Sequence, residues 1–363
     1  MQIKEILTTL EDFAPLAFQE PYDNSGLCIG NPNKEVKALL LTIDITEDVI
    51  DEAIKLGCNL IISHHPLIFS GIKSLTGQNC IERCIIYAIK NDIAIYSAHT
   101  NLDIAPMGVS YMMAQKLGLK NIKILSPLEN KLLKLVSFVP FEHAEKVREA
   151  IFEAGAGHIG NYDRCSYNLE GNGTFRGNEN SNPFVGISGQ DHTEPEIRIE
   201  TILPAHIKNK VLKALLNAHP YEEPAYDIYP LLNTFEKAGL GAIGKIEPVE
   251  EKVFLKKIKE VFNVTIVRHT PLQNKKIETV ALCGGSGSNL LKNAIKEQAD
   301  IFISSDFKYH QFFDHEKKIL IADIGHFESE QFTKEIFYQI IKKKFANFAV
   351  HFSSINTNPI NYY

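Results

Sequence analysis

The chain has 363 residues, of which 44% are hydrophobic and 23% charged, with a net charge of −6 and a pI near 6.1. These values are ordinary for a globular protein and argue against nucleic acid as its main partner, because nucleic-acid-binding domains are usually basic. The length favours two domains. The six cysteines are scattered and several lie in apolar runs, so we expect them to be reduced core thiols of a cytoplasmic protein. No apolar run approaches the ~20 residues that a bilayer span needs.

The first part of the chain alternates between strand and helix patterns. Short unbroken apolar runs predict buried strands, and apolar residues with helical spacing predict helices. In chain order we expect a strand at 38–44, a helix at 47–56, a strand at 59–63, a helix at 81–90 and a strand at 93–97. This alternation favours a largely parallel sheet with helices on both faces.

The pattern changes near Pro127, where a different unit begins. Its expected elements are a strand at 132–139, a helix at 144–154, a glycine-broken strand at 163–176, a mobile loop at 171–183, a strand at 196–203, a helix at 205–217 and a strand at 225–230. The order β-α-β-β-α-β is that of a ferredoxin-like unit. Because the α/β alternation resumes afterwards, we place an inserted domain at 129–232 within a discontinuous α/β domain at 1–128 and 233–363.

The segment after this insert repeats the segment before it. Three stretches match in the same order: 39–41 with 280–282, 53–63 with 294–304, and 93–99 with 319–326. The last pair ends on His99 and His326, each of which stands four residues before a carboxylate. These matches predict an internal duplication, with one α/β half on each side of the insert.

Histidines and carboxylates follow three of the predicted strands. In chain order they are His64 and His65, His99 and Asp103, and His326 and Glu330. Parallel α/β sheets bind ligands beyond the carboxyl ends of their strands, so these groups would converge if the two halves face each other. Imidazole and carboxylate suit Zn²⁺, Mn²⁺ or Fe²⁺, and the set is large enough for two ions if Glu330 bridges them.

These residues also have structural interpretations. Adjacent side chains of a strand point to opposite faces, so His64 and His65 could reach two metals only at an irregular strand end, which Pro66 favours. As a pair they fit equally well as ligands or as hydrogen-bonded core residues. His326 and Glu330 have the spacing of an ordinary pair on one helix face.

Further residues are candidates for supporting roles. His99 and His310 could transfer protons, and Asp44, at the end of the first strand, could orient a ligand. His310 fits equally well as an ordinary residue of a helix face. The glycine-rich turn at 283–289, CGGSGSN, either allows close packing or holds a phosphate before the next helix.

Taken together, these motifs resemble a known family. SHHP at 63–66, AHTNLD at 98–103 and GHFESE at 325–330 are similar, in kind and order, to motifs of the Nif-three-like family, whose members are also named GTP cyclohydrolase 1 type 2 homologues. PYDNSGL at 21–27 resembles an early motif of that family. HPYEEPAYD at 219–227 resembles the PII/CutA-like insert of its longer members.

The resemblance implies a duplicated three-layer α/β domain with a ferredoxin-like, PII/CutA-like inserted domain. It also implies a homohexameric ring, a trimer of dimers, and a dinuclear metal site at His64, His65, Asp103, His326 and Glu330. Family members often have Thr-Gly-Glu where this chain has SSD at 304–306, so the carboxylate is kept on a shorter side chain.

Two functions fit these expectations. The first is a metal-dependent hydrolase of GTP or another cyclic or phosphorylated small molecule, in which two divalent ions activate water. The second is a non-catalytic, metal-dependent regulatory or binding ring whose insert senses a small molecule or a partner. The size of the insert and the glutamates Glu222 and Glu223 on a proline-bounded loop motivate the second function.

Overall fold

The computed structural model describes residues 1–363. The chain separates into two compact units. One unit is discontinuous and comprises Met1–Pro127 and Glu236–Tyr363, and the other is the insert, Leu128–Phe235. None of the helices has the length and apolar character that a bilayer span requires.

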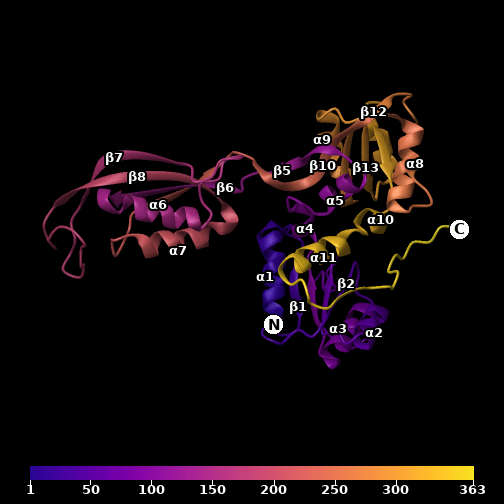
Figure 1. The fold of residues 1–363 in the computed structure, drawn as a ribbon, viewed down its shortest axis with the longest axis horizontal. Helices are drawn as coiled ribbons and strands as arrows, with labels where there is room; N and C mark the ends of the chain where they lie inside the picture. The colour runs from indigo at the N-terminus through magenta and orange to yellow at the C-terminus, as the bar shows by residue number, and fades with distance from the viewer. The chain divides into compact units, whose positions relative to one another are not determined.

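The discontinuous unit contains two sheets (Figure 1). The first has the order β1-β4-β3-β2-β15, and all its neighbours are parallel except the edge pair β1 and β4. Its strands are β1 (Gly26–Ile29), β2 (Leu39–Thr42), β3 (Leu60–Ser63), β4 (Ala94–Ser97) and β15 (Val350–Phe352). Strands β2, β3 and β4 are buried along their whole length, as expected of strands covered on both faces.

The second sheet has the order β11-β14-β13-β12-β10-β5. Strands β12, β13 and β14 are parallel, and β11 runs antiparallel to β14 at the edge. The strands are β5 (Lys120–Leu128), β10 (Phe235–Glu250), β11 (Arg268–His269), β12 (Lys276–Ser286), β13 (Ile301–Ser305) and β14 (Leu320–Asp323).

The two sheets confirm the duplication. The order β1-β4-β3-β2 in one sheet corresponds to β11-β14-β13-β12 in the other, each with three parallel strands and one antiparallel edge. The halves also exchange strands, which the repeat did not predict. β15, from the C-terminal segment, pairs with β2, and β5, from the N-terminal segment, lies in the second sheet.

Helices cover both faces of each sheet. They are α1 (Ile3–Phe13), α2 (Glu47–Lys55), α3 (Cys80–Lys90), α4 (Thr100–Ile104), α5 (Val109–Lys116), α8 (Glu251–Phe262), α9 (Leu291–Lys296), α10 (His326–Glu330) and α11 (Thr333–Lys344). The largest core joins one face of both sheets to α1, α5, α8 and α11. The opposite face of the first sheet packs on α2 and α3, and that of the second sheet on α9. Short 3₁₀ turns add η1 (Leu16–Phe18), η4 (Ser288–Leu290) and η5 (Tyr309–His315).

The insert has the predicted ferredoxin-like topology. Its sheet order is β7-β8-β6-β9, with every neighbouring pair antiparallel. Its elements are β6 (Leu132–Pro140), η2 (Phe141–His143), α6 (Ala144–Glu153), β7 (Ser166–Phe175), β8 (His192–Pro204), η3 (Ala205–Ile207), α7 (Lys208–Ala218) and β9 (Tyr226–Leu231). Both long helices pack on one face of the sheet around a small apolar core.

Two details differ from the sequence expectations. The glycine-rich residues 171–175 belong to β7 and not to a loop, because each pairs with a residue of β8. The six cysteines are free, but Cys80 is exposed and is therefore not a core thiol.

Candidate metal centre

Six predicted site residues meet in one place within the discontinuous unit. His64 and His65 follow β3, His99 and Asp103 lie at the start of α4 and within it, and His326 and Glu330 begin and end α10. We call this set the histidine–carboxylate cluster: His64, His65, His99, Asp103, His326 and Glu330. Its side chains come from both halves of the duplication, as the convergence argument predicted.

The cluster contains three overlapping groups that could hold a metal ion. The groups are His64 with His65 and His99, His65 with His326 and Glu330, and His64 with Asp103 and Glu330. Within each group the candidate ligand atoms lie within 4.8 Å of one another. Glu330 belongs to two groups through different oxygens: Oε1 lies 3.5 Å from Nε2 of His64, and Oε2 lies 2.9 Å from Nε2 of His65.

Each of the four histidines is anchored through Nδ1. The Nδ1 partners are the carbonyl of Ala98 for His64 (2.9 Å), Asp44 for His65 (2.7 Å), Asp23 for His99 (2.7 Å) and Asp306 for His326 (2.6 Å). A carbonyl or carboxylate oxygen can only accept, so Nδ1 carries the proton in every ring. Hydrogen bonds of this kind orient metal-binding histidines and leave Nε2 free to coordinate.

The Nε2 atoms and the carboxylates face one another without suitable partners. Nε2 of His64 is fully buried with no hydrogen bond, and so are Oδ1 of Asp103 and Oε2 of Glu330. Glu330 Oε2 lies within ion-pair distance of two imidazoles, but those contacts lack hydrogen-bond geometry. Buried polar atoms are almost always satisfied, and a cation is the one partner that suits all three atoms. The residues therefore fit a metal site.

The electrostatics agree with this interpretation. Burial opposes protonation of His65, but the hydrogen bond with Asp44 and the nearby negative charge of Glu330 outweigh it and raise its pKa to about 10. Burial likewise opposes protonation of His326, yet Asp306 and Glu330 raise its pKa to about 11. Their Nε2 atoms are only 3.3 Å apart, so protons on both would repel. The site attracts positive charge, and a divalent ion supplies it without that repulsion.

Asp103 and His64 show the complementary effect. Burial, and then the neighbouring charge of Glu330, raises the pKa of Asp103 well above its usual range. Burial lowers the pKa of His64, so its imidazole stays neutral. A cation at this place would favour the ionised form of Asp103, and the neutral imidazole of His64 could coordinate it.

The glycine-rich turn of the second half packs directly against the cluster. Gly285 has a φ of +60°, and a Cβ there would lie 2.2 Å from Oε1 of Glu330. The hydroxyl groups of Ser304 and Ser305 donate to its carbonyl. This arrangement favours close packing over phosphate binding for the turn, because its glycine makes room for the carboxylate of Glu330.

Replacing Gly285 with alanine should therefore displace Glu330 and weaken metal binding about 10-fold or more, the usual effect of disturbing a ligand's surroundings. The matched control is Gly57→Ala. Gly57 has a similar φ of +70°, but nothing lies within 4 Å of the added Cβ. Metal titration followed by calorimetry compares the two variants. Equal affinities in both would contradict the close-packing argument.

Of the three candidates for supporting roles, Asp44 and His99 lie at the cluster and His310 does not. Asp44 orients His65 as expected, and its other oxygen accepts a hydrogen bond from Thr357 in the C-terminal segment (2.6 Å). His99 lies within the cluster. His310 is exposed in η5 against the ring of Tyr309, and the structure does not bring it to the cluster.

Three supporting residues were not assigned from the sequence. Asp23, which anchors His99, lies in the quoted PYDNSGL motif, and Asp306, which anchors His326, lies in the SSD segment. Both were visible as motif residues without a role. The contact of Thr357 with Asp44 could not be predicted, because no motif in the sequence around Thr357 points to the cluster.

Comparison with known proteins agrees with these motifs. The family model described as Duf34/NIF3 (NGG1p interacting factor 3) matches residues 1–359. The chain belongs to this family. It is 42% identical to a Halalkalibacterium halodurans protein and 36% identical to one from Bacillus subtilis, both named GTP cyclohydrolase 1 type 2 homolog. These alignments cover 98% and 99% of this chain, respectively, and 98% of each relative.

Solved structures of the NIF3 group share the fold along the whole chain. A Bacillus cereus protein related to NIF3 superimposes with a TM-score of 0.86 at 40% identity, covering 100% of this chain and 99% of that one. A Staphylococcus aureus protein superimposes with a TM-score of 0.79 at 31% identity and the same coverage. The duplicated α/β architecture with its insert is thus shared with these two solved structures.

Proposed function

We propose that this NIF3-family chain is a metal-dependent hydrolase that holds two divalent ions, Zn²⁺, Mn²⁺ or Fe²⁺. The proposed ligands are His64, His65, Asp103, His326 and Glu330. The observation that carries the proposal is the sharing of Glu330 between two ligand groups, one with His64 and Asp103 and the other with His65 and His326. A carboxylate shared in this way would help to hold two neighbouring ions, which is the arrangement of two-metal hydrolytic sites.

The residues of the chain have distinct roles in this proposal. When bound, the ions would supply Lewis acidity and an activated water. Asp44 and Asp306 hold the imidazoles of His65 and His326 in the orientation that presents Nε2. His99 is held by Asp23 in the same way, and its Nε2 is the atom placed to accept or release a proton near the substrate.

The substrate is proposed to be a small molecule. Asp103 is the one cluster residue that lines a cavity of about 650 Å³, a size that suits a nucleotide. Its charged lining residues are Asp103, Lys123, Glu236, Lys237 and Glu297. The names of the relatives make GTP the first candidate, and opening its imidazole ring requires attack of water on a ring carbon. Another cyclic or phosphorylated compound fits the same chemistry.

The test begins with metal content. Untagged protein, purified without added metal, is expected to carry about two transition-metal equivalents per chain by plasma mass spectrometry. Chelation should abolish hydrolysis of GTP or of the cyclic and phosphorylated compounds screened beside it, and Zn²⁺, Mn²⁺ or Fe²⁺ should restore it. Protein that stays empty when offered all three ions would end the proposal. Two bound ions without turnover of any compound would reject the hydrolase and leave the metal-dependent binding ring.

We further propose that the protein is a cytoplasmic homohexamer, a trimer of dimers, as the family resemblance implies. The expected mass by light scattering is six times the chain mass of 40.8 kDa. A monomer or an isolated dimer at micromolar concentration would contradict this assembly.

A further inference from the structure

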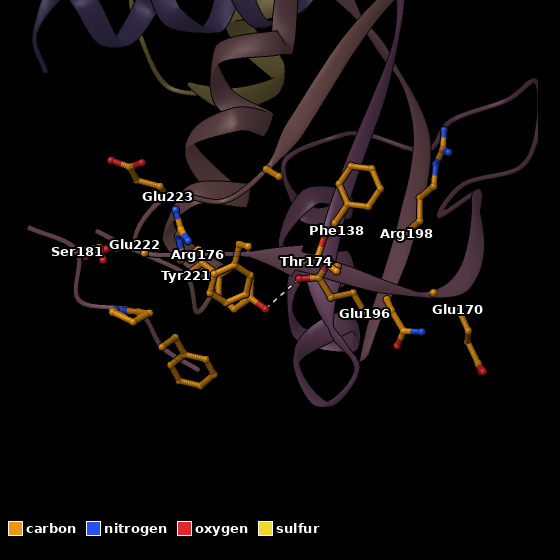
Figure 2. Close-up of a pocket in the computed structure, with 18 of the residues that line it drawn as sticks. Phe138, Glu170, Thr174, Arg176, Ser181, Glu196, Arg198, Tyr221, Glu222 and Glu223 are labelled. Carbon is orange, nitrogen blue, oxygen red and sulfur yellow. Dashed lines mark hydrogen bonds between the residues drawn. The ribbon is translucent and has the colours of Figure 1, made fainter. Parts of the chain in front are cut away.

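The insert contains a cavity that has no part in the proposed hydrolysis. It measures about 630 Å³ and lies on strands β6, β7 and β8, under the segment after β7 and the segment before β9 (Figure 2). The backbone N–H of Asn182 donates a hydrogen bond to the side-chain Oε1 of Glu222 (2.9 Å), and this bond joins the two segments. The cavity is thus a built feature of one folded unit, and its volume suits a molecule of nucleoside size.

Two glycines make the floor of the cavity. Residues paired across antiparallel strands share a face, so Gly171, opposite Glu196, and Gly173, opposite Glu194, lie on the face away from the helices. A Cβ at Gly173 would lie 2.2 Å from Oε2 of Glu196, whereas one at Gly171 would meet nothing within 4 Å. The absence of a side chain at Gly171 leaves open space in the cavity, and its absence at Gly173 makes room for the carboxylate of Glu196.

Aromatic rings form the walls around one tyrosine. The ring of Tyr221 lies 5.9 Å from that of Phe175 and 6.3 Å from that of Phe184, measured between centroids. Phe138 lines the cavity from β6. Rings at these distances and tilted angles offer faces on which a planar ring can stack.

A buried carboxylate sits among these rings. Glu196 is only 8% exposed, and its Oε1 accepts a hydrogen bond from the hydroxyl of Tyr221 (2.9 Å), as the dashed line in Figure 2 shows. It forms no ion pair with any basic side chain, and Oε2 accepts no hydrogen bond from the protein. Beside it on β8, Nε of Arg198 is also buried without a partner. A buried carboxylate with free acceptor capacity favours a ligand that donates N–H groups.

We propose that this cavity binds an uncharged nitrogen heteroaromatic of the nucleobase or nucleoside class that presents neighbouring N–H donors. The planar ring stacks against Tyr221 and its neighbours, and the donor edge of the ring meets the carboxylate of Glu196. Guanine has such an edge, with a ring N–H next to an amino group. Stacking combined with hydrogen bonds to the base edge is the general way in which proteins hold an isolated base.

The charges of the lining select against phosphorylated forms. Glu170 is opposite Ile197, so its carboxylate lies on the helix face. The three other carboxylates of the lining, from Glu196, Glu222 and Glu223, outnumber the two guanidinium groups of Arg176 and Arg198. A triphosphate would add negative charge to a lining that already has an excess of it. A nucleoside is therefore expected to bind more tightly than its triphosphate.

The test is calorimetric titration of the full chain with guanosine, inosine and GTP. EDTA is present throughout, so that the metal centre does not contribute. Inosine lacks the amino group and should bind about 10-fold more weakly than guanosine, the usual cost of one hydrogen bond to a charged group. Glu196→Gln keeps an acceptor for Tyr221 but loses the charge, and should weaken guanosine binding at least about 10-fold.

A second variant tests the place of binding independently of Glu196. Gly171→Val puts a side chain into open space within the cavity and should abolish binding without disturbing the fold. Asn168→Val is the matched control, because Asn168 is an exposed residue of the same strand that does not line the cavity. Undetectable guanosine binding to the wild type, equal affinity for inosine, tighter binding of GTP, or binding that survives Gly171→Val would each overturn the proposal.

Discussion

Replacing Glu330 with glutamine is expected to leave the protein folded but at least about 100-fold weaker in metal affinity. Glu330 is 2% exposed, and its two oxygens lie within 3.5 Å of Nε2 of His64 and of His65. A neutral amide keeps the size of the side chain. It offers a single oxygen, however, and its NH₂ group cannot coordinate a cation, so it cannot bridge two ions. Turnover should disappear together with the metal.

The control is Glu328→Gln in the same short helix. Oε1 of Glu328 accepts a hydrogen bond from the amide of Asn358 (2.9 Å), so this carboxylate is engaged away from the cluster. Plasma mass spectrometry gives the metal content, and circular dichroism gives the fold. Normal metal content in Glu330→Gln, or equal metal loss in both variants, would contradict the bridging role.

Replacing Asp23 with asparagine is expected to lower the free energy of unfolding by about 2–3 kcal/mol. The side chain has no exposed surface and accepts hydrogen bonds from His99, Thr100 and Ser25. Burial alone would raise its pKa, but the hydrogen bonds with His99 and Thr100 outweigh it and hold the pKa well below the usual range. An asparagine presents one acceptor oxygen, and its NH₂ group would face donors.

The depressed pKa sets the pH dependence of this effect. The stabilisation by the ionised carboxylate is complete at neutral pH, above the carboxyl pKa of the unfolded chain, and fades as the pH falls through the folded pKa. The gap between wild type and Asp23→Asn should therefore be constant near neutrality and close only in strong acid. Urea unfolding of chelated protein measures it, with Asp12→Asn, an exposed change in α1, as the control. A loss no larger than that of Asp12→Asn would contradict the anchoring role of Asp23.

Much of the fold was predictable because it is encoded locally. The all-apolar runs at 39–41 and 60–62 and the capped, periodic stretch that becomes α2 determine their own secondary structure. Thr46 accepts the N-cap hydrogen bond of α2, and Lys55 lies in its last turn. The ferredoxin-like order of the insert follows from the succession of such local patterns. The exchange of β5 and β15 between the sheets could not be predicted in this way, because the local sequence of an edge strand does not determine which strand it pairs with.

The sequence by itself determined the ligand types and the strand ends that carry them, because successive parallel strands end at the same edge of a sheet. Only the tertiary structure decided which ring each carboxylate holds. His99 meets Asp23 across 76 positions, His65 and His326 meet across 261, and Thr357 reaches Asp44 across 313. His310 is exposed in η5. From the sequence we expect it near the cluster, because it follows the strand that corresponds to the one before His64. Periodicity reports the conformation of neighbouring residues, whereas contacts over such separations arise from the packing of whole layers against one another.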